Sequence, residues 1–335
     1  MTDPGAQQQG RLSRGWFGKV AAAIFIALAA LATYELRITP SAPGWHMEFA
    51  NIVEARKFPE QPELLLRTEY TGIASVDYGL QFLVAAFLPG AAGFVKDFET
   101  VGGAIIIALY CLAFMRDTAR LEYYSAPAMR VPLGYARSLA PALVLGFLLP
   151  TVAIYLPFND PGLNTKQALV ALWQPTPFFV NGLLLVLPRI FSAASTKPES
   201  DTADGDATYV KNLYRTCMVV TAIAHIIMLA HFGVLDSHVS FAHVFLPDST
   251  RFPDSGAEIL HFIFQWDYLI IFGASLLWAC VAIYDLSIIG RVKLNVTWLI
   301  SVIVVGSVVF GPAATIAFAF MWREERMRKD SKVKV

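Results

Sequence analysis

The feature that most constrains this chain is a succession of long apolar runs separated by short polar segments. A helix rises 1.5 Å per residue, so about 20 apolar residues cross the roughly 30 Å hydrocarbon core of a bilayer. Eight runs approach this length, near residues 17–36, 73–95, 101–115, 138–157, 168–190, 213–234, 259–284 and 296–321. Only 16% of the residues are charged, against about 25% in soluble domains. We therefore predict an all-α, polytopic transmembrane helical bundle of seven to eight spans, with the short 101–115 run leaving the number open.

The first run and the polar segments divide the chain into four parts. Arg11, Arg14 and Lys19 precede the first run, a pattern shared by cleaved secretory signals and retained signal anchors. The run reaches the length of a span, which favours an anchor over residues 1–36. We expect a polar extramembrane loop over 37–71, a transmembrane bundle over 72–322 with a flexible loop near 192–208, and a basic tail over 323–335. The acids of the flexible loop are expected to be solvated.

The Lys and Arg residues that flank the runs give conflicting indications of orientation. The loops after the third and fifth runs and the C-terminal tail are all rich in these residues, and such segments stay in the cytoplasm. Eight complete crossings cannot put all three on one side. Either one run does not cross the membrane, or one of the basic segments lies on the non-cytoplasmic side. The number of basic segments to be placed on one side favours seven crossings.

Composition and spacing exclude several function classes. Lys plus Arg and Asp plus Glu each total 26, so the formal net charge is zero and no nucleic-acid partner is indicated. The cysteines Cys111, Cys217 and Cys280 are far apart in apolar stretches, which predicts packing residues and no disulfide or zinc site. His225 and His231 are six residues apart, which is not the i, i+4 spacing of two metal ligands on a helix. We expect no metal and no cofactor.

Motifs of other catalytic centres are missing from the sequence. It contains no DDxxD or NDxxDxxxD stretch that would hold a magnesium diphosphate, and no DxDD, GxSxG, P-loop or GxGxxG. An enzyme of this kind that acts on a lipid-like substrate is left with proton transfer by carboxylic acids.

Two carboxylates lie inside apolar runs, where an ionisable group is expensive and marks a candidate functional site. Asp77 lies about one turn inside the second run, with Gln81 one turn further along the same face. Asp267 lies two to three turns inside the seventh run. We expect both carboxylates to face one interior cavity, where burial keeps an acid protonated. In the alternative, each is wetted near the headgroups or pairs with a basic residue and fixes helix packing.

Aromatic and polar side chains accompany these acids. At 100° per residue Trp278 shares a helix face with Asp267, and Glu258, His261 and Gln265 form a second polar stripe on the same helix. An aromatic face stabilises a cation by about 2 kcal/mol in a dry pocket, so an acid among such rings suits a carbocation reaction. The candidate substrate-binding residues are Tyr78, Gln81, Asn181, His261, Gln265, Trp266, Tyr268 and Trp278. For Asn181 an interhelical hydrogen bond is the alternative role.

In these features the chain resembles the small integral-membrane terpene cyclases of fungal meroterpenoid pathways. The resemblance rests on size, on the hydropathy profile, on Val76-Asp77-Tyr78, and on Gln265-Trp266-Asp267-Tyr268 with Trp278. It covers residues 70 to 320, and the longer members similar to the macrophorin and ascofuranone cyclases are the nearest in type.

The resemblance implies a proton-initiated (class II, non-ionising) cyclisation of a farnesyl-type chain on an aromatic or quinol head. One acid would protonate an alkene or an epoxide, and a base would remove the final proton. The family's acids carry over to Asp77 and Asp267, with Glu122 as a weaker third candidate. The family often has a Glu near the end of a span where this chain has Asp77. The implied substrate is a lipophilic small molecule, and the implied location is the endoplasmic reticulum membrane.

Other classes of function remain open from the residues alone. A proton- or cation-coupled transporter would use Asp77 and Asp267 as ion sites, although such proteins usually show internal repeats, and none is evident here. A non-catalytic membrane scaffold and a proton-shuttling isomerase acting on a sterol are further alternatives. Membrane lipid is an expected partner, and the sequence does not indicate an oligomeric state.

Overall fold

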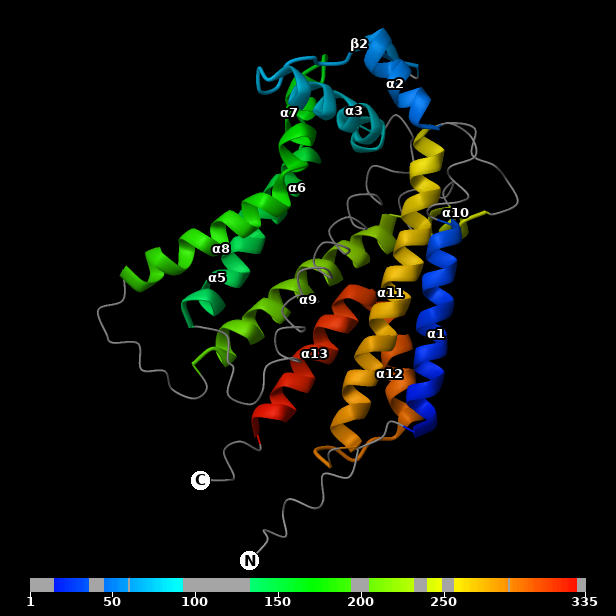
Figure 1. Ribbon diagram of the computed structural model, residues 1–335, viewed down its shortest axis with the longest axis vertical. Helices are drawn as coiled ribbons and strands as arrows, with labels where there is room; N and C mark the ends of the chain where they lie inside the picture. The colour runs from blue at the N-terminus through cyan, green and yellow to red at the C-terminus, as the bar shows by residue number, and fades with distance from the viewer. Residues whose placement is uncertain are drawn as a thin grey trace, which may run out of the picture.

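The computed structural model is a bundle of tilted helices with a smaller polar cap at one end (Figure 1). It describes residues 15–35, 45–59, 61–92, 133–193, 205–231, 240–248, 256–288 and 290–329. Glu122 and Cys111, with the predicted 101–115 run, lie outside these residues.

The described elements are almost all helical, as the sequence predicts. In chain order they are α1 (Gly15–Thr33), α2 (Trp45–Ala55), β1 (Lys57–Phe58), β2 (Gln61–Leu65), α3 (Ala74–Ala91), α5 (Leu133–Leu143), a π-helical turn (Val144–Leu148), α6 (Leu149–Ile154), α7 (Asn164–Trp173), α8 (Thr176–Ala193), α9 (Ala207–Ala230), α10 (Phe241–Phe245), α11 (Gly256–Ile288), α12 (Val296–Val309) and α13 (Pro312–Lys329).

Four helical segments among the described residues are long and apolar enough to cross a membrane: Gly15–Thr33, Leu133–Ile154, Ala207–Ala230 and Glu258–Ile288. Helices α7 and α8 meet at a bend of 59° and would make a fifth span if they cross together. The all-α class is confirmed, and the predicted count of seven to eight spans is not.

Within the described residues, the predicted runs 73–95 and 296–321 contain apolar helices shorter than a span. In the first, the apolar helix from Ala74 to Pro89 is shorter than a span, and in the second only Val296–Val309 is an apolar helix. The second run is broken because Gly311 adopts φ 89°, in the left-handed region that favours glycine. Pro312 then begins α13, a position that proline tolerates well. Helices α12 and α13 therefore form a hairpin.

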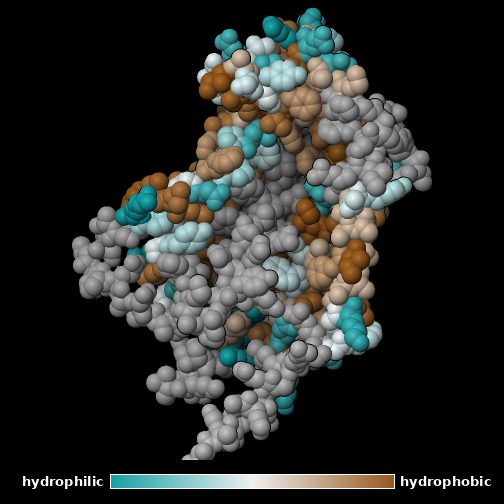
Figure 2. All heavy atoms as spheres, viewed as in Figure 1, coloured by the Kyte–Doolittle hydropathy of each residue, from teal (hydrophilic) through white to brown (hydrophobic). Residues whose placement is uncertain are grey.

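The polar cap consists of α2, the β1–β2 hairpin, α3 and α7. The hairpin is antiparallel, with Lys57 opposite Leu65. Gln167 of α7 is fully buried and hydrogen-bonds to the backbone at the end of β2. Its side-chain amide donates to the Leu65 carbonyl at 3.0 Å, and its side-chain oxygen accepts from the Arg67 amide at 2.7 Å. The apolar core of the cap is formed by Phe49, Phe58, Leu64, Val84, Leu88 and Val170. Figure 2 shows hydrophilic residues gathered over this end of the molecule.

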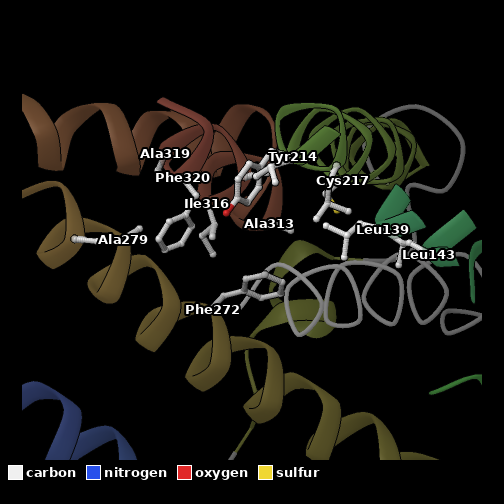
Figure 3. Close-up of a cluster of buried hydrophobic side chains, with 14 of the residues drawn as sticks. Leu139, Leu143, Tyr214, Cys217, Phe272, Ala279, Ala313, Ile316, Ala319 and Phe320 are labelled. Atoms are coloured by element: carbon white, nitrogen blue, oxygen red, sulfur yellow. The ribbon is translucent and has the colours of Figure 1, made fainter. Parts of the chain in front are cut away.

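The main core lies where α5, α9, α11 and α13 converge (Figure 3). Tyr214 of α9 is fully buried and stacks on Phe320 of α13, with ring centroids 6.4 Å apart. Phe320 in turn contacts the Trp278 ring of α11 at 4.7 Å. The first of these contacts joins residues 106 apart along the chain, and the second joins residues 42 apart.

Candidate active site

A partly open apolar pocket lies at the junction of α3, α6 and α7. Its cavity volume is about 20 Å³, and it is lined by Phe87, Ala91, Thr151, Ile154, Tyr155, Val170 and Trp173. Aromatic and aliphatic walls with one hydroxyl and one indole N–H are typical of a site for an apolar ligand.

The Trp173 indole is held in the pocket wall by a chain of hydrogen bonds. Its Nε1 donates to the Thr151 hydroxyl at 3.0 Å, and that hydroxyl donates to the Phe147 carbonyl at 2.8 Å. Phe147 belongs to the π-helical turn between α5 and α6, a distortion often found at functional sites. The ring of Trp173 also meets Phe87 edge-on at 5.9 Å. Sequence reasoning missed this pair, because Thr151 and Trp173 are 22 residues apart on different helices.

Asp267 lies on α11, one turn from Phe264, which contacts a residue that lines this pocket. Phe264 contacts the pocket-lining Phe87, with ring centroids 6.2 Å apart, and Asp267 follows Phe264 by three residues on the adjoining part of the helix surface. Glu258 begins the candidate span, so Asp267 lies about 14 Å along it. The Asp267 side chain is partly buried and has no hydrogen-bond or ion-pair partner among the described residues. An unpaired carboxylate at this depth of a span is costly.

Asp77 has the opposite environment. It is 5% exposed, and its carboxylate accepts from the amides of Tyr70, Thr71 and Gly72 at 3.3, 2.7 and 3.0 Å and from the Thr71 hydroxyl at 2.8 Å. Burial raises the pKa of this carboxyl, but the hydrogen bonds from Thr71, Tyr70 and Gly72 outweigh it and hold the pKa below its ordinary value. Asp77 therefore fixes the loop that leads into α3 as a carboxylate.

This geometry corrects two expectations about Asp77. It lies in the first turn of α3, a shorter apolar helix among the described residues, and its hydrogen bonds favour the ionised form over the protonated one. It is ten residues, about 15 Å, along α3 from Phe87, so the described structure does not bring it to Asp267 in one cavity. The two predicted substrate-binding residues near Asp77 do not line the pocket either. Tyr78 is 60% exposed, and Gln81 donates to the Thr68 carbonyl at 2.8 Å.

Gln265 and His261 hold the short helix α10 against α11. The Gln265 amide is buried and donates to the carbonyls of His243 at 2.6 Å and Val244 at 3.0 Å. His261 Nε2 lies 3.4 Å from the same Val244 carbonyl. Carbonyls at the end of a helix lack hydrogen-bond donors within that helix. The side chains of Gln265 and His261 supply donors to those of α10.

The three predicted aromatic residues of α11 differ in what they contact. Tyr268 lies against Phe245 of α10 at 5.3 Å and Phe272 at 4.7 Å. Trp278 packs on Phe320 in the main core, about 17 Å along the helix from Asp267. The Trp266 Nε1 is buried and has no hydrogen-bond partner among the described residues.

Asn181, a predicted substrate-binding residue, is exposed on α8 and donates to the Pro177 carbonyl of its own helix at 2.7 Å. It is bonded within one helix, and neither the expected interhelical bond nor a pocket contact is described. Asp206, expected to be a solvated loop acid, is instead 5% exposed and accepts both terminal nitrogens of Arg328 at 2.8 and 3.2 Å.

The fold and this site define an all-α membrane protein with an acid in the candidate span Glu258–Ile288, one turn from a residue that contacts the wall of an aromatic pocket. The CtvD domain model matches residues 20–98 and 96–328. The chain therefore belongs to the CtvD domain family, as the resemblance to fungal membrane terpene cyclases predicts.

Curated relatives are similar to this chain at low identity. Terpene cyclase verU1 from Penicillium polonicum is 23% identical over 307 residues, which cover 76% of this chain and 80% of that protein. Terpene cyclase DEP1 from Alternaria brassicicola is 26% identical over 254 residues, covering 68% and 66%. FAD-dependent monooxygenase verC1 from Penicillium polonicum is 27% identical over 210 residues, 61% of this chain, and the match spans only 25% of the monooxygenase. No solved structure matches the chain. The chain is thus similar to proteins named terpene cyclase over most of their length and to a quarter of a protein named FAD-dependent monooxygenase.

Proposed function

We propose that this protein is a multi-pass terpene cyclase of the endoplasmic reticulum membrane that performs a proton-initiated cyclisation in meroterpenoid biosynthesis. The substrate is a farnesyl-type chain on an aromatic or quinol head, or the epoxide of that chain. The observation that carries the proposal is the unpaired Asp267 in the α11 span, one turn from the Phe264–Phe87 contact at the apolar pocket.

Asp267 acts as the proton donor. The carboxyl O–H bond breaks as the proton reaches the terminal alkene carbon or the epoxide oxygen, and a tertiary cation develops at the neighbouring carbon. The next double bond then attacks that carbon, which closes a ring and moves the cation along the chain. Loss of a proton to a base ends the sequence, so the reaction is an isomerisation with no net consumption of acid.

The pocket supplies the surroundings that such a cation needs. The faces of Trp173 and Phe87 stabilise positive charge, and the apolar walls exclude water that would capture the cation early. Thr151 is the positioning residue, because its hydroxyl fixes the indole N–H. A substrate with a polar head and an apolar chain would enter with the chain toward these rings.

The final base stays a prediction. The hydrogen bonds to Asp77 favour its ionised carboxylate, which is able to accept a proton. The same four hydrogen bonds fit a role in holding the loop before α3. Glu122 lies outside the described residues. The similarity to part of two FAD-dependent monooxygenases, verC1 and ntnA, favours an oxidised chain, and therefore the epoxide, as substrate.

The test is an assay on microsomes that contain the full chain, incubated with a farnesylated quinol and separately with its terminal epoxide. We expect cyclised product from the wild type and none from Asp267→Asn, since the amide keeps the shape of the side chain but is not an acid. The matched control is Asp285→Asn, 18 residues further along the same helix, which should retain activity. Normal product from folded Asp267→Asn would refute Asp267 as the donor, and proton-coupled uptake in vesicles without product would favour a transporter.

A further inference from the structure

The end of the bundle opposite the cap carries a buried cation whose charge no described acid balances. Arg323 lies on α13, one turn after the core residue Phe320, and is only 7% exposed. Its Nε is buried without a hydrogen-bond partner among the described residues. Leaving a buried charged donor unpaired costs more than leaving a neutral one, so the position calls for an anion.

The acidic side chains of α13 and the one that precedes α9 are already paired with other cations. On α13, Glu324 accepts from Arg328 and Glu325 from Lys211. Asp206, which directly precedes α9, takes the remaining nitrogens of Arg328 at 2.8 and 3.2 Å. Helix α9 itself contains no acidic residue. The described α9–α13 contact therefore leaves Arg323 as a surplus positive charge.

The surroundings of Arg323 are those of a membrane surface. Helix α1 begins, α11 ends and α13 ends at this end of the molecule, at the bottom of Figure 1. The described basic residues in or beside these helix ends are Lys19, Arg291, Lys293, Arg323, Arg326 and Arg328. The neighbouring Trp322 carries the Arg326 guanidinium 5.2 Å from its ring centroid, and tryptophans of this kind mark the headgroup level. A concentration of Lys and Arg at one end indicates the cytoplasmic side, whose leaflet holds the anionic lipids.

We infer that Arg323 forms a binding site for a phosphate group, supplied by an acidic phospholipid of the cytoplasmic leaflet. The planar guanidinium presents paired donors that match phosphate oxygens, which a diffuse surface charge does not. The flanking basic residues add attraction of longer range. The inference rests on the packing of α13 alone and is independent of the proposed cyclase reaction.

The test is lipid binding by the full chain purified in a neutral detergent, measured by native mass spectrometry and by the shift in Tm. The probes are dioctanoyl phosphatidic acid, dioctanoyl phosphatidylcholine and inorganic phosphate. We expect phosphatidic acid to bind the wild type and raise its Tm more than phosphatidylcholine does. Arg323→Gln should weaken that binding by about tenfold or more, the scale of one charge-assisted hydrogen bond.

Arg326→Gln is the matched control, because Arg326 is exposed on the same helix and should bind phosphatidic acid as the wild type does. Arg323→Lys keeps the charge without the forked donors and should give an intermediate affinity, which decides the matter if Arg323→Gln does not fold. Equal binding of the two lipids by the wild type, or unchanged binding by Arg323→Gln, would overturn the site. Equal protection by inorganic phosphate would overturn the lipid as its source.

Discussion

At the scale of single residues, the two candidate acids of the sequence, Asp77 and Asp267, have different chemistry. Asp77 receives four hydrogen bonds from three consecutive residues, whereas Asp267 receives none from the described residues. A carboxylate saturated with donors is suited to hold a loop, and an acid with free oxygens beside a pocket is suited to meet a substrate.

The role of Asp77 can be tested through the pH dependence of stability. Its pKa is held below the unfolded value, so its contribution is present at neutral pH and is lost as the pH falls below about 4 toward the folded pKa. We expect thermal unfolding in detergent to show this loss in the wild type, and Asp77→Asn to lower the Tm at pH 7 and flatten the acid limb. If Asp77→Asn kept the wild-type Tm but lost cyclase turnover, Asp77 would instead be a catalytic residue.

Trp173 can be tested by the products it allows. Trp173→Ala removes a face worth up to about 2 kcal/mol to a cation, so we expect early-terminated or partly cyclised products, while Trp173→Phe keeps a ring and gives the normal product more slowly. Product profiling with the farnesylated substrate measures this. Trp278→Ala is the control: its ring packs on Phe320 in the core, so it should lower the Tm without truncating the product. Truncation by Trp278→Ala alone would move the cation site to α11.

At the scale of elements, short breaks in the helices decide how the site is built. The π-helical turn after α5 brings Gly146 so close to α8 that a Cβ there would lie 2.8 Å from Val180 Cγ2 and 2.9 Å from its backbone nitrogen. The same turn presents the Phe147 carbonyl to Thr151. A regular helix through Val144–Leu148 would rotate Thr151 away from Trp173.

The α12–α13 hairpin depends on Gly311. Its φ of 89° disfavours any other residue, and a Cβ would lie 2.9 Å from the His225 ring. We expect Gly311→Ala to destabilise the protein by at least about 1–2 kcal/mol, the cost of a left-handed conformation, measured as a fall in Tm. Gly182→Ala on α8, where nothing lies within 4 Å of a Cβ, should be neutral or slightly stabilising. Equal Tm values for the two variants would contradict this account of the hairpin.

At the scale of the whole molecule, the structure has at one end a cap over which hydrophilic residues gather (Figure 2), and α1 begins and α11 and α13 end at the other (Figure 1). Among the described residues, run 296–321 is divided at Gly311 into α12 and α13, so the basic residues Arg323, Arg326 and Arg328 follow two helices and not one crossing. The predicted conflict rested on counting this run as one crossing.

This topology predicts opposite labelling of two introduced cysteines. Glu63→Cys, in the cap hairpin, should be shielded in sealed microsomes from a membrane-impermeant thiol reagent, whereas Lys293→Cys, between α11 and α12, should react because basic loops remain cytoplasmic. Detergent should make both reactive. Cys217 and Cys280 are buried and give little background, and a chain without introduced cysteine measures it. Labelling of both positions in sealed vesicles would contradict the topology.

The sequence by itself determined the all-α membrane class, several of the spans and the presence of an unusual acid in the span from Glu258 to Ile288. These follow from local properties, because an apolar run and a helical period are read from consecutive residues. Only the tertiary structure decided that Asp77 caps a loop, that Trp173 and Thr151 form a pocket wall, and that Asp206 pairs with Arg328 across 122 residues. Hydrogen-bond and ion-pair partners are set by how helices pack, and sequence periodicity carries no information about which distant side chain completes a buried polar group.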